Sequence, residues 1–248
     1  MRQFTRSQLD YHRLLPFRAA GIFLVDDNVS FRFLHFYFIA LRNLFAYPPG
    51  DILRCGIKWE YFVQILMMRK INEIFYSLQG EGYHTGTPAI FVRFSGCNLK
   101  CDFCDTQHEE GKMMTDDEII AEVKKYPAVT VVLTGGEPSL LVDDELIDRL
   151  HQAGKYVTIE TNGTRPLPAA IDWVTCSPKQ GAKLAIDRMD EVKVVYEGQD
   201  ISIFELLPAE HFFLQPCSCN NTALTVDCVM RHPKWRLSLQ THKLIDIR

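Results

Sequence analysis

The sequence lacks the features that define several broad classes of protein. Its formal net charge is −4, so it has no surplus of positive charge that would favour nucleic acid as a partner. It shows no signal-peptide pattern, no internal repeats and no low-complexity segment. Its most apolar run, residues 31–45, is interrupted by two arginines and a histidine, whereas a membrane-spanning helix needs roughly 20 predominantly apolar residues. We therefore expect a cytoplasmic protein with no membrane segment.

The first 66 residues differ from the rest of the chain. They show no clean helical or strand period, and their aromatic run is followed by the breaker cluster YPPGD. An orderly pattern begins only around Met67 and Met68. Our hypothesis is that residues 1–66 are an atypical, non-native N-terminal extension, such as upstream sequence translated from a misplaced start, and that residues 67–248 form the functional domain. The alternative is a lineage-specific arm packed on that domain.

From Met68 onward, apolar strand-like runs alternate with helical segments. Residues 128–136, AVTVVLTGG, are nearly apolar throughout, as a buried parallel strand should be. Residues 115–126 begin with a capping-box pattern of Thr115 and Glu118, and residues 143–154 form a second helix that stops at Gly154. Further strands are expected at residues 89–96, 156–163, 172–179, 191–198, 211–216 and 235–245. The alternation predicts an α/β fold with a mostly parallel sheet and little room for helices between the later strands.

Polar motifs occur where four of these strands end. Cys97 follows the first strand, and the motifs TGGEP, ETNG and SPK follow the next three. Ligands of α/β proteins bind at the carboxyl ends of parallel strands. The simplest interpretation is one site built from several strand ends.

Three of the eight cysteines, Cys97, Cys101 and Cys104, form a Cys-x3-Cys-x2-Cys motif. In a reducing compartment, such a group points to a metal site or to catalysis rather than to disulfides. An iron–sulfur cube has four corners, so three thiolates leave one iron open. S-adenosylmethionine (SAM) can chelate that iron. The alternative is a tetrahedral zinc site that borrows a distant fourth thiol. That thiol would come from Cys176, Cys217, Cys219 or Cys228.

The cysteine motif, with Phe103 just before its last cysteine, resembles the radical SAM superfamily, and TGGEP resembles that superfamily's glycine-rich motif. Four further stretches are similar to the 7-carboxy-7-deazaguanine synthase family: FYSLQGEG at residues 75–82, CDT at 104–106, ETNGT at 160–164 and SLQTHKLIDIR at 238–248. The resemblance covers roughly residues 68–248. It implies an abridged, partial (βα) barrel of the radical SAM type.

The resemblance also implies an activity. The family is a carbon–nitrogen lyase that converts 6-carboxy-5,6,7,8-tetrahydropterin to 7-carboxy-7-deazaguanine with loss of ammonia, in the biosynthesis of queuosine for tRNA modification. The implied cofactors are a [4Fe-4S] cluster on Cys97, Cys101 and Cys104, SAM, and Mg²⁺ on Thr106. The implied partners are the small pterin substrate, a flavodoxin- or ferredoxin-type reductant and a second copy in a homodimer. The resemblance implies no nucleic-acid or membrane partner.

Individual positions follow from the same resemblance. Gln79 and Glu81 suit the amino and ring N–H edges of a pterin, and Arg93 could clamp its carboxylate. The expected substrate-binding residues are Leu78, Gln79, Gly80, Glu81, Arg93, Thr134 and His242. The expected SAM-binding residues are Phe103, Asp105, Gly136, Glu160, Asn162, Ser177, Pro178, Lys179 and Gln215.

Several of these positions have plainer interpretations. His242 could be packing, Thr106 could cap its loop, and Arg93 could form a surface ion pair. We expect Cys217 and Cys219 to be ordinary thiols outside any cluster, and Cys176 to be a small core residue. Two rival functions remain: an activase that installs a glycyl radical on a partner, and a non-catalytic iron–sulfur or zinc module.

Overall fold

The computed structural model describes residues 68–104 and 106–248. The predicted extension over residues 1–66, and Asp105, therefore lie outside the described residues. Within them, nine strands form one sheet in the order β3-β1-β2-β4-β5-β6-β7-β8-β9. The strands are β1 (Arg69–Leu78), β2 (Pro88–Phe94), β3 (Lys112–Met114), β4 (Thr130–Gly135), β5 (Tyr156–Thr161), β6 (Trp173–Cys176), β7 (Glu191–Tyr196), β8 (His211–Pro216) and β9 (Arg236–Leu237).

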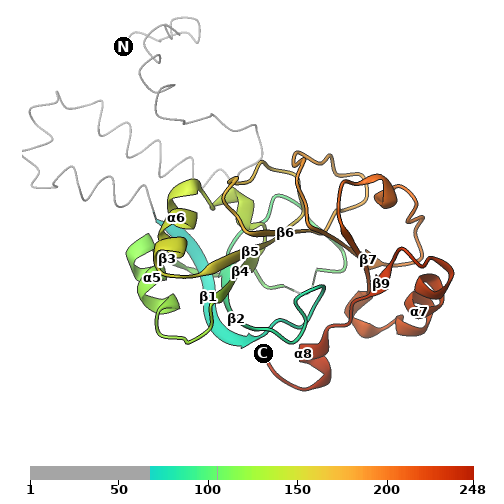
Figure 1. The fold of residues 1–248 in the computed structure, drawn as a ribbon, viewed down its shortest axis with the longest axis horizontal. Helices are drawn as coiled ribbons and strands as arrows, with labels where there is room; N and C mark the ends of the chain where they lie inside the picture. Colours follow the sequence, from blue (N-terminus) through green and yellow to red (C-terminus); the bar gives the residue numbers. More distant parts are fainter. Residues whose placement is uncertain (1–67, 105) are drawn as a thin grey trace, which may run out of the picture. The chain divides into compact units, whose positions relative to one another are not determined.

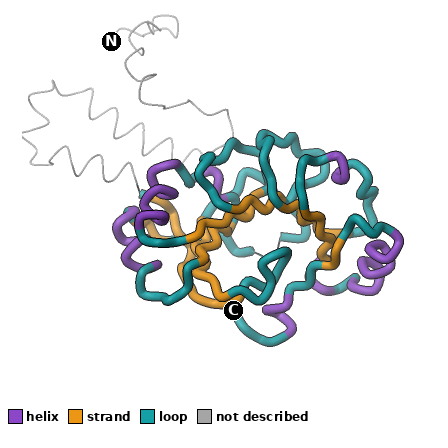
Figure 2. Tube along the Cα trace, in the orientation of Figure 1, coloured by secondary structure: helices purple, strands orange, loops and turns teal. Residues whose placement is uncertain are grey.

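The sheet is mostly parallel and curved, which confirms the predicted α/β class. From β2 to β9 every neighbouring pair is parallel, whereas β1 pairs antiparallel with both β2 and β3. The strands follow an open arc, with helices α5 (Asp116–Val123), α6 (Asp144–Gln152) and α7 (Thr222–Arg231) on its convex side (Figures 1 and 2). Among the described residues, no helix is long and apolar enough to cross a membrane.

The two predicted helices are α5 (Asp116–Val123) and α6 (Asp144–Gln152), and their N-termini are capped by side chains. The expected capping box is present: the Thr115 hydroxyl accepts from the Glu118 amide, while the Glu118 carboxylate accepts from the Thr115 amide. Helix α6 buries Leu146, Ile147 and Leu150 completely. These apolar faces pack the helices onto the outer face of the sheet.

Other sequence predictions were wrong. Helix α7 (Thr222–Arg231) lies between two of the later strands, where little room for a helix was expected. Its β-branched residues obscure the helical pattern in the sequence. The buried face is also narrow, because only Thr225 and Cys228 of this helix are buried. The expected strand at residues 235–245 pairs only over Arg236–Leu237 and then turns into helix α8 (Thr241–Leu244).

Arg69 ties the start of β1 to both helices. Its guanidinium forms a two-nitrogen ion pair with Asp116 of α5, at 2.6 and 3.0 Å, and contacts Asp143, the N-cap of α6, at 2.8 Å. Arg69 and Asp116 are only 5 and 6% exposed. Because neither charge reaches much water, each depends on the other for compensation.

Removing this arginine should therefore be costly. We expect Arg69→Met to lower the free energy of unfolding by about 3 kcal/mol, because Asp116 would stay buried without its partner. Urea unfolding would measure the change. The control is Lys125→Met, which removes an exposed ion pair with Glu122 and should change nothing measurable. Equal midpoints for both variants would contradict the prediction.

Candidate active site

A cavity of about 910 Å³ lies at the carboxyl ends of the strands and collects most of the predicted site residues. From the cluster and SAM groups it is lined by Cys97, Cys101, Cys104, Thr106, Phe103, Gly136, Glu160, Asn162, Ser177, Lys179 and Gln215. From the substrate group it is lined by Leu78, Gln79, Gly80, Glu81, Arg93, Thr134 and His242. Pro178 instead lines a smaller neighbouring cavity of about 170 Å³.

The cysteine loop follows β2 and presents its three thiols to this cavity. None of the three cysteines is in a disulfide. The loop is held by a hydrogen bond from the Cys104 amide to the Cys101 carbonyl, at 3.1 Å. Among the described residues, no three His, Cys, Asp or Glu side chains are grouped closely enough to hold one metal ion. Three thiols on one loop facing one cavity fit a cube with an open corner.

Gly135 and Gly136 of the TGGEP motif let two backbones approach closely. A Cβ atom on Gly135 would lie 2.2 Å from the Phe94 carbonyl oxygen, and one on Gly136 would lie 2.0 Å from the Gly96 carbonyl oxygen. The Gly136 amide donates to the Phe94 carbonyl at 3.1 Å. Glycine is required here because any side chain would push the motif away from the loop that carries Cys97.

Glu137 of the same motif joins the ends of β4 and β5. It is only 1% exposed. One carboxylate oxygen accepts from the Thr161 hydroxyl at 2.6 Å and from the Ser139 amide and hydroxyl, while the other accepts from the Asn162 amide at 2.7 Å. A buried carboxylate is tolerated because these donors satisfy it. It fixes the ETNG motif beside TGGEP.

Asn162 connects the ETNG motif to the cysteine loop. Its side-chain amide donates to Asn98 at 3.0 Å, and Asn98 donates to Thr164 at 2.7 Å. Three loops that follow β2, β4 and β5 are thus linked by side chains. This arrangement keeps the expected SAM-binding residues next to the cysteines.

Among the residues expected to bind SAM, Lys179 of the SPK motif approaches Phe103. Its ammonium lies 5.6 Å from the Phe103 ring centroid and donates to the Ser177 hydroxyl at 2.7 Å. Burial lowers the pKa of Lys179. The SPK motif after β6 and the residue before the last cysteine of the motif therefore lie close together in the structure.

The LQGEG loop after β1 is packed against the C-terminal segment. The Gly80 carbonyl accepts from the amide and the hydroxyl of Thr241, at 2.9 and 3.0 Å. A Cβ atom on Gly80 would lie 2.1 Å from His242 Nδ1. His242 therefore lines the cavity and packs on this glycine, and its contact with substrate stays a prediction.

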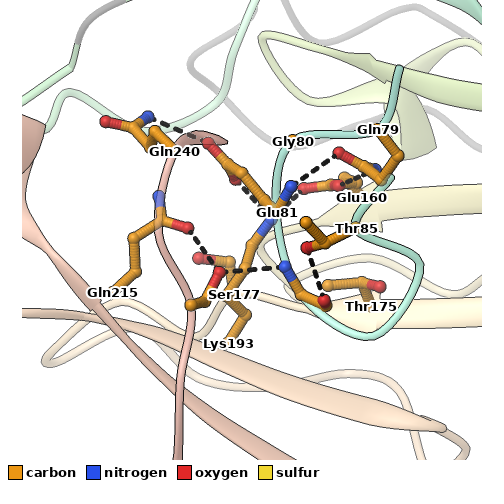
Figure 3. Close-up of polar contacts among 12 residues, drawn as sticks. Gln79, Gly80, Glu81, Thr85, Glu160, Thr175, Ser177, Lys193, Gln215 and Gln240 are labelled. Atoms are coloured by element: carbon orange, nitrogen blue, oxygen red, sulfur yellow. Dashed lines mark hydrogen bonds and ion pairs between the residues drawn. The ribbon is translucent and has the colours of Figure 1, made fainter. Parts of the chain in front are cut away.

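A polar network crosses the cavity beneath this loop (Figure 3). Lys193 of β7 contacts Glu81 at 2.6 Å and Glu160 at 2.5 Å. The Gln240 amide donates to Glu81 at 2.9 Å, and the Gln79 amide donates to Glu160 at 2.9 Å. Glu160, expected on the SAM side, is thus joined to the loop expected to bind substrate.

The charges in this network determine its protonation. Burial alone would lower the pKa of Lys193, but the carboxylates of Glu160 and Glu81 outweigh burial and raise it above its ordinary value. Burial alone would raise the pKa of Glu81, but the Lys193 charge and its hydrogen bonds hold it below its ordinary value. Lys193 is therefore a cation and Glu81 an anion at neutral pH.

Glu191 lies two residues before Lys193 on β7, so both side chains point to the same face. It is 1% exposed, and its Oε2 accepts from the Tyr83 amide at 3.0 Å. Among the described residues its Oε1 has no hydrogen-bond partner. Burial raises the pKa of Glu191 from its ordinary 4.5 to about 7, against the opposing charge of Lys193.

This shift makes stability depend on pH. The folded state holds the Glu191 proton more tightly than the unfolded chain does, so stability falls as the pH rises from about 4.5 to 7. Glu191→Gln should remove this loss and, above pH 7, be more stable than the wild type by about 3 kcal/mol. Urea unfolding of both proteins from pH 5 to 8 measures it. If the stabilities of the two proteins change with pH in parallel, the raised pKa of Glu191 would be contradicted.

Arg93 of β2 is expected to clamp the substrate carboxylate, and it lines the cavity as required. In the structure its Nε donates to Glu73 at 2.9 Å. Arg248 also pairs with Glu73 and lies 5.0 Å from the Phe75 ring centroid. Arg248 also lines the cavity, so two arginines reach the site around one carboxylate.

Sequence analysis missed Glu137, Lys193 and Glu191. Glu137 is part of the quoted TGGEP motif, and its position directly after a nearly apolar strand was the available signal. Lys193 and Glu191 interrupt the apolar strand EVKVVY, and charges on a strand predicted to be buried could have marked them. Cys176 is fully buried, as expected.

The fold and this cavity define a radical SAM protein. Residues 91–188 match the Radical SAM superfamily. The chain is 90% identical over 182 residues to a 7-carboxy-7-deazaguanine synthase of Bacteroides thetaiotaomicron, covering 73% of this chain and 100% of the relative. It is 41% identical over 209 residues to one from Burkholderia multivorans, again covering 73% and 100%.

The chain belongs to the 7-carboxy-7-deazaguanine synthase family. A solved structure agrees with this assignment. The crystal structure of QueE from Escherichia coli superposes with a TM-score of 0.61 at 30% sequence identity, covering 73% of this chain and 98% of that chain. The predicted superfamily, family and fold class are confirmed.

Proposed function

We propose that this chain converts 6-carboxy-5,6,7,8-tetrahydropterin to 7-carboxy-7-deazaguanine with loss of ammonia, as a step in queuosine biosynthesis. The observation that carries the proposal is one cavity lined both by the three thiols of a cluster motif and by Gln79, Glu81 and Arg93. The first group suits radical chemistry, and the second suits a flat heterocycle that bears N–H groups and a carboxylate.

Three thiolates, from Cys97, Cys101 and Cys104, would hold a [4Fe-4S] cluster. When bound, the cluster and SAM together would supply a 5′-deoxyadenosyl radical. The chain's task is to position both reactants and keep water out. Phe103, Gly136, Asn162, Ser177, Lys179 and Gln215 line the side of the cavity proposed for SAM, with Asp105 and Pro178 proposed nearby.

The substrate side comprises Leu78, Gln79, Gly80, Glu81, Arg93, Thr134 and His242. Glu81 would accept from the N–H edge of the pterin, and the guanidinium of Arg93 would pair with its carboxylate. Thr106 would offer one hydroxyl ligand to Mg²⁺, which keeps several waters and accepts substrate oxygens. The cysteine loop and Thr106 border the same cavity, which supports a metal between cluster and substrate.

The cellular setting follows from the chemistry. The cluster needs an electron for each radical it forms, so we propose a flavodoxin- or ferredoxin-type reductant and a cytoplasmic location. A homodimer is proposed from the family. Residues 67–248 would carry the whole activity, and residues 1–66 would be a non-native extension. The mass of the protein purified from its own cell would test this last proposal.

The activity can be tested directly with the full chain. The cluster is reconstituted without oxygen and supplied with SAM, Mg²⁺, a strong reductant and the tetrahydropterin, and products are followed by mass spectrometry. We expect 7-carboxy-7-deazaguanine, and we expect chelation of Mg²⁺ to slow its formation. Formation of 5′-deoxyadenosine alone would keep the superfamily and discard the substrate. If the protein with a fully loaded cluster cleaves no SAM, the proposed activity is contradicted.

A further inference from the structure

Lys193 is a buried cation at the inner surface of the catalytic cavity. Its side chain is 4% exposed, and its Nζ lies 2.6 Å from Glu81 Oε2 and 2.5 Å from Glu160 Oε2. The two carboxylates come from different elements, the LQGEG loop after β1 and the end of β5. Figure 3 shows the lysine reaching between them.

The amide side chains around the cavity complete the arrangement. Gln240 donates to the second oxygen of Glu81, and Gln79 donates to the second oxygen of Glu160, each at 2.9 Å. Each carboxylate is therefore held from both sides, once by the ammonium and once by an amide. An ionised carboxylate has about four lone-pair sites, so each still has capacity to accept from a ligand. Both carboxylates line the cavity.

The charge balance explains why a lysine is needed. Two partly buried carboxylates close together would repel each other, and without a cation between them proton uptake by one would be favoured. A protonated carboxyl group is a poor acceptor for N–H donors. One ammonium shared between the two keeps both ionised and fixes the direction of their free lone pairs.

We propose that Lys193 is a positioning residue for substrate recognition, which holds Glu81 and Glu160 as a paired acceptor for an N–H-rich edge of the heterocycle. The proposal rests on the proposed function and deepens it. It also assigns Glu160 to the substrate rather than to SAM. Lys193 itself acts through the two carboxylates and takes no part in the chemical step.

The test measures steady-state constants for both reactants in the full, cluster-loaded chain. In Lys193→Met we expect the KM for the tetrahydropterin to rise on the order of thirtyfold, because the acceptor pair loses its shared cation. We expect the KM for SAM to stay within about threefold of the wild type, and uncoupled formation of 5′-deoxyadenosine without pterin to persist. Lys193→Arg, which keeps the charge, should restore much of the affinity for the pterin.

The matched control is Lys155→Met. Lys155 is a partly buried lysine that donates to the Ala128 carbonyl at 2.6 Å and does not line the cavity. Its loss should leave both KM values unchanged. If Lys193→Met does not fold, Lys193→Gln/Glu191→Gln replaces it and is assayed above pH 7, where Glu191 is mostly ionised, so that the pair of changes removes one cation and one carboxylate together. The same rise in the pterin KM is expected.

The outcomes separate this proposal from the proposed function. A wild-type enzyme that makes no 7-carboxy-7-deazaguanine would overturn the function. An active wild type whose Lys193 variant keeps its pterin KM would overturn the positioning role. A selective rise in the KM for SAM would also overturn it, because Glu160 would then serve SAM.

Discussion

Replacing Cys101 with alanine should abolish the formation of 5′-deoxyadenosine. The residue is the central member of the three-cysteine motif, and its thiol lines the catalytic cavity with those of Cys97 and Cys104. A cube held by only two thiolates would be lost or left unable to present a single open iron. The measurement is the iron content and visible absorbance of the reconstituted protein, followed by SAM cleavage under strong reductant.

The same substitution at Cys219 is the control. That residue is partly buried in the turn after β8, and it does not line the cavity. Cys219→Ala should keep the cluster and the activity. Loss of iron from Cys219→Ala to the same extent as from Cys101→Ala would contradict a cluster held by three thiolates with one open iron, because Cys219 would then be a fourth ligand.

The second large effect is expected at Glu137. In Glu137→Ala the Thr161 hydroxyl and the amides of Ser139 and Asn162 lose their acceptor inside the protein. We expect the free energy of unfolding to fall by about 3 kcal/mol or more, since hydrogen bonds to a buried charge are costly to lose. Urea unfolding would measure this loss, and SAM affinity should weaken because the ETNG motif loses its attachment to TGGEP.

Two further variants make the Glu137 prediction specific. Glu137→Gln preserves the shape of the side chain but places an NH2 group opposite one of the backbone donors, so an intermediate loss is expected. Glu145→Ala removes an exposed glutamate of α6 and should change the stability by less than about 0.5 kcal/mol. If Glu137→Ala and Glu145→Ala have similar free energies of unfolding, the role of Glu137 in joining the ends of β4 and β5 would be contradicted.

The elements that could be predicted from the sequence are those with a local signature. The capping box at Thr115 and the apolar strand β4 depend on neighbours within a few residues, and both are confirmed. The antiparallel strand β1 was not recognised, because the charged residues Arg69, Lys70 and Glu73 in its first half interrupt the apolar pattern. Helix α7 was missed because its β-branched residues favour a strand pattern.

The site shows the same division. The three cysteines and the two glycines of TGGEP are short motifs whose spacing already indicates a cluster and a close backbone approach. Lys193 has no such motif, because its meaning depends on Glu81 and Glu160, which are 112 and 33 residues away. A buried lysine becomes interpretable only when the fold brings its counter-ions to it.

The network around Lys193 also limits when the site can form during folding. It joins residue 81 to residues 160, 193 and 240, so it closes loops of widely different length. Contacts of such long range are reached only after much of the intervening sheet has paired, because loop closure has an entropic cost. Helices α5 and α6 can form early from local contacts, whereas the cavity should be among the last parts of the domain to acquire native structure. Pulse-labelling hydrogen exchange would then detect protection in α6 before protection in the LQGEG loop.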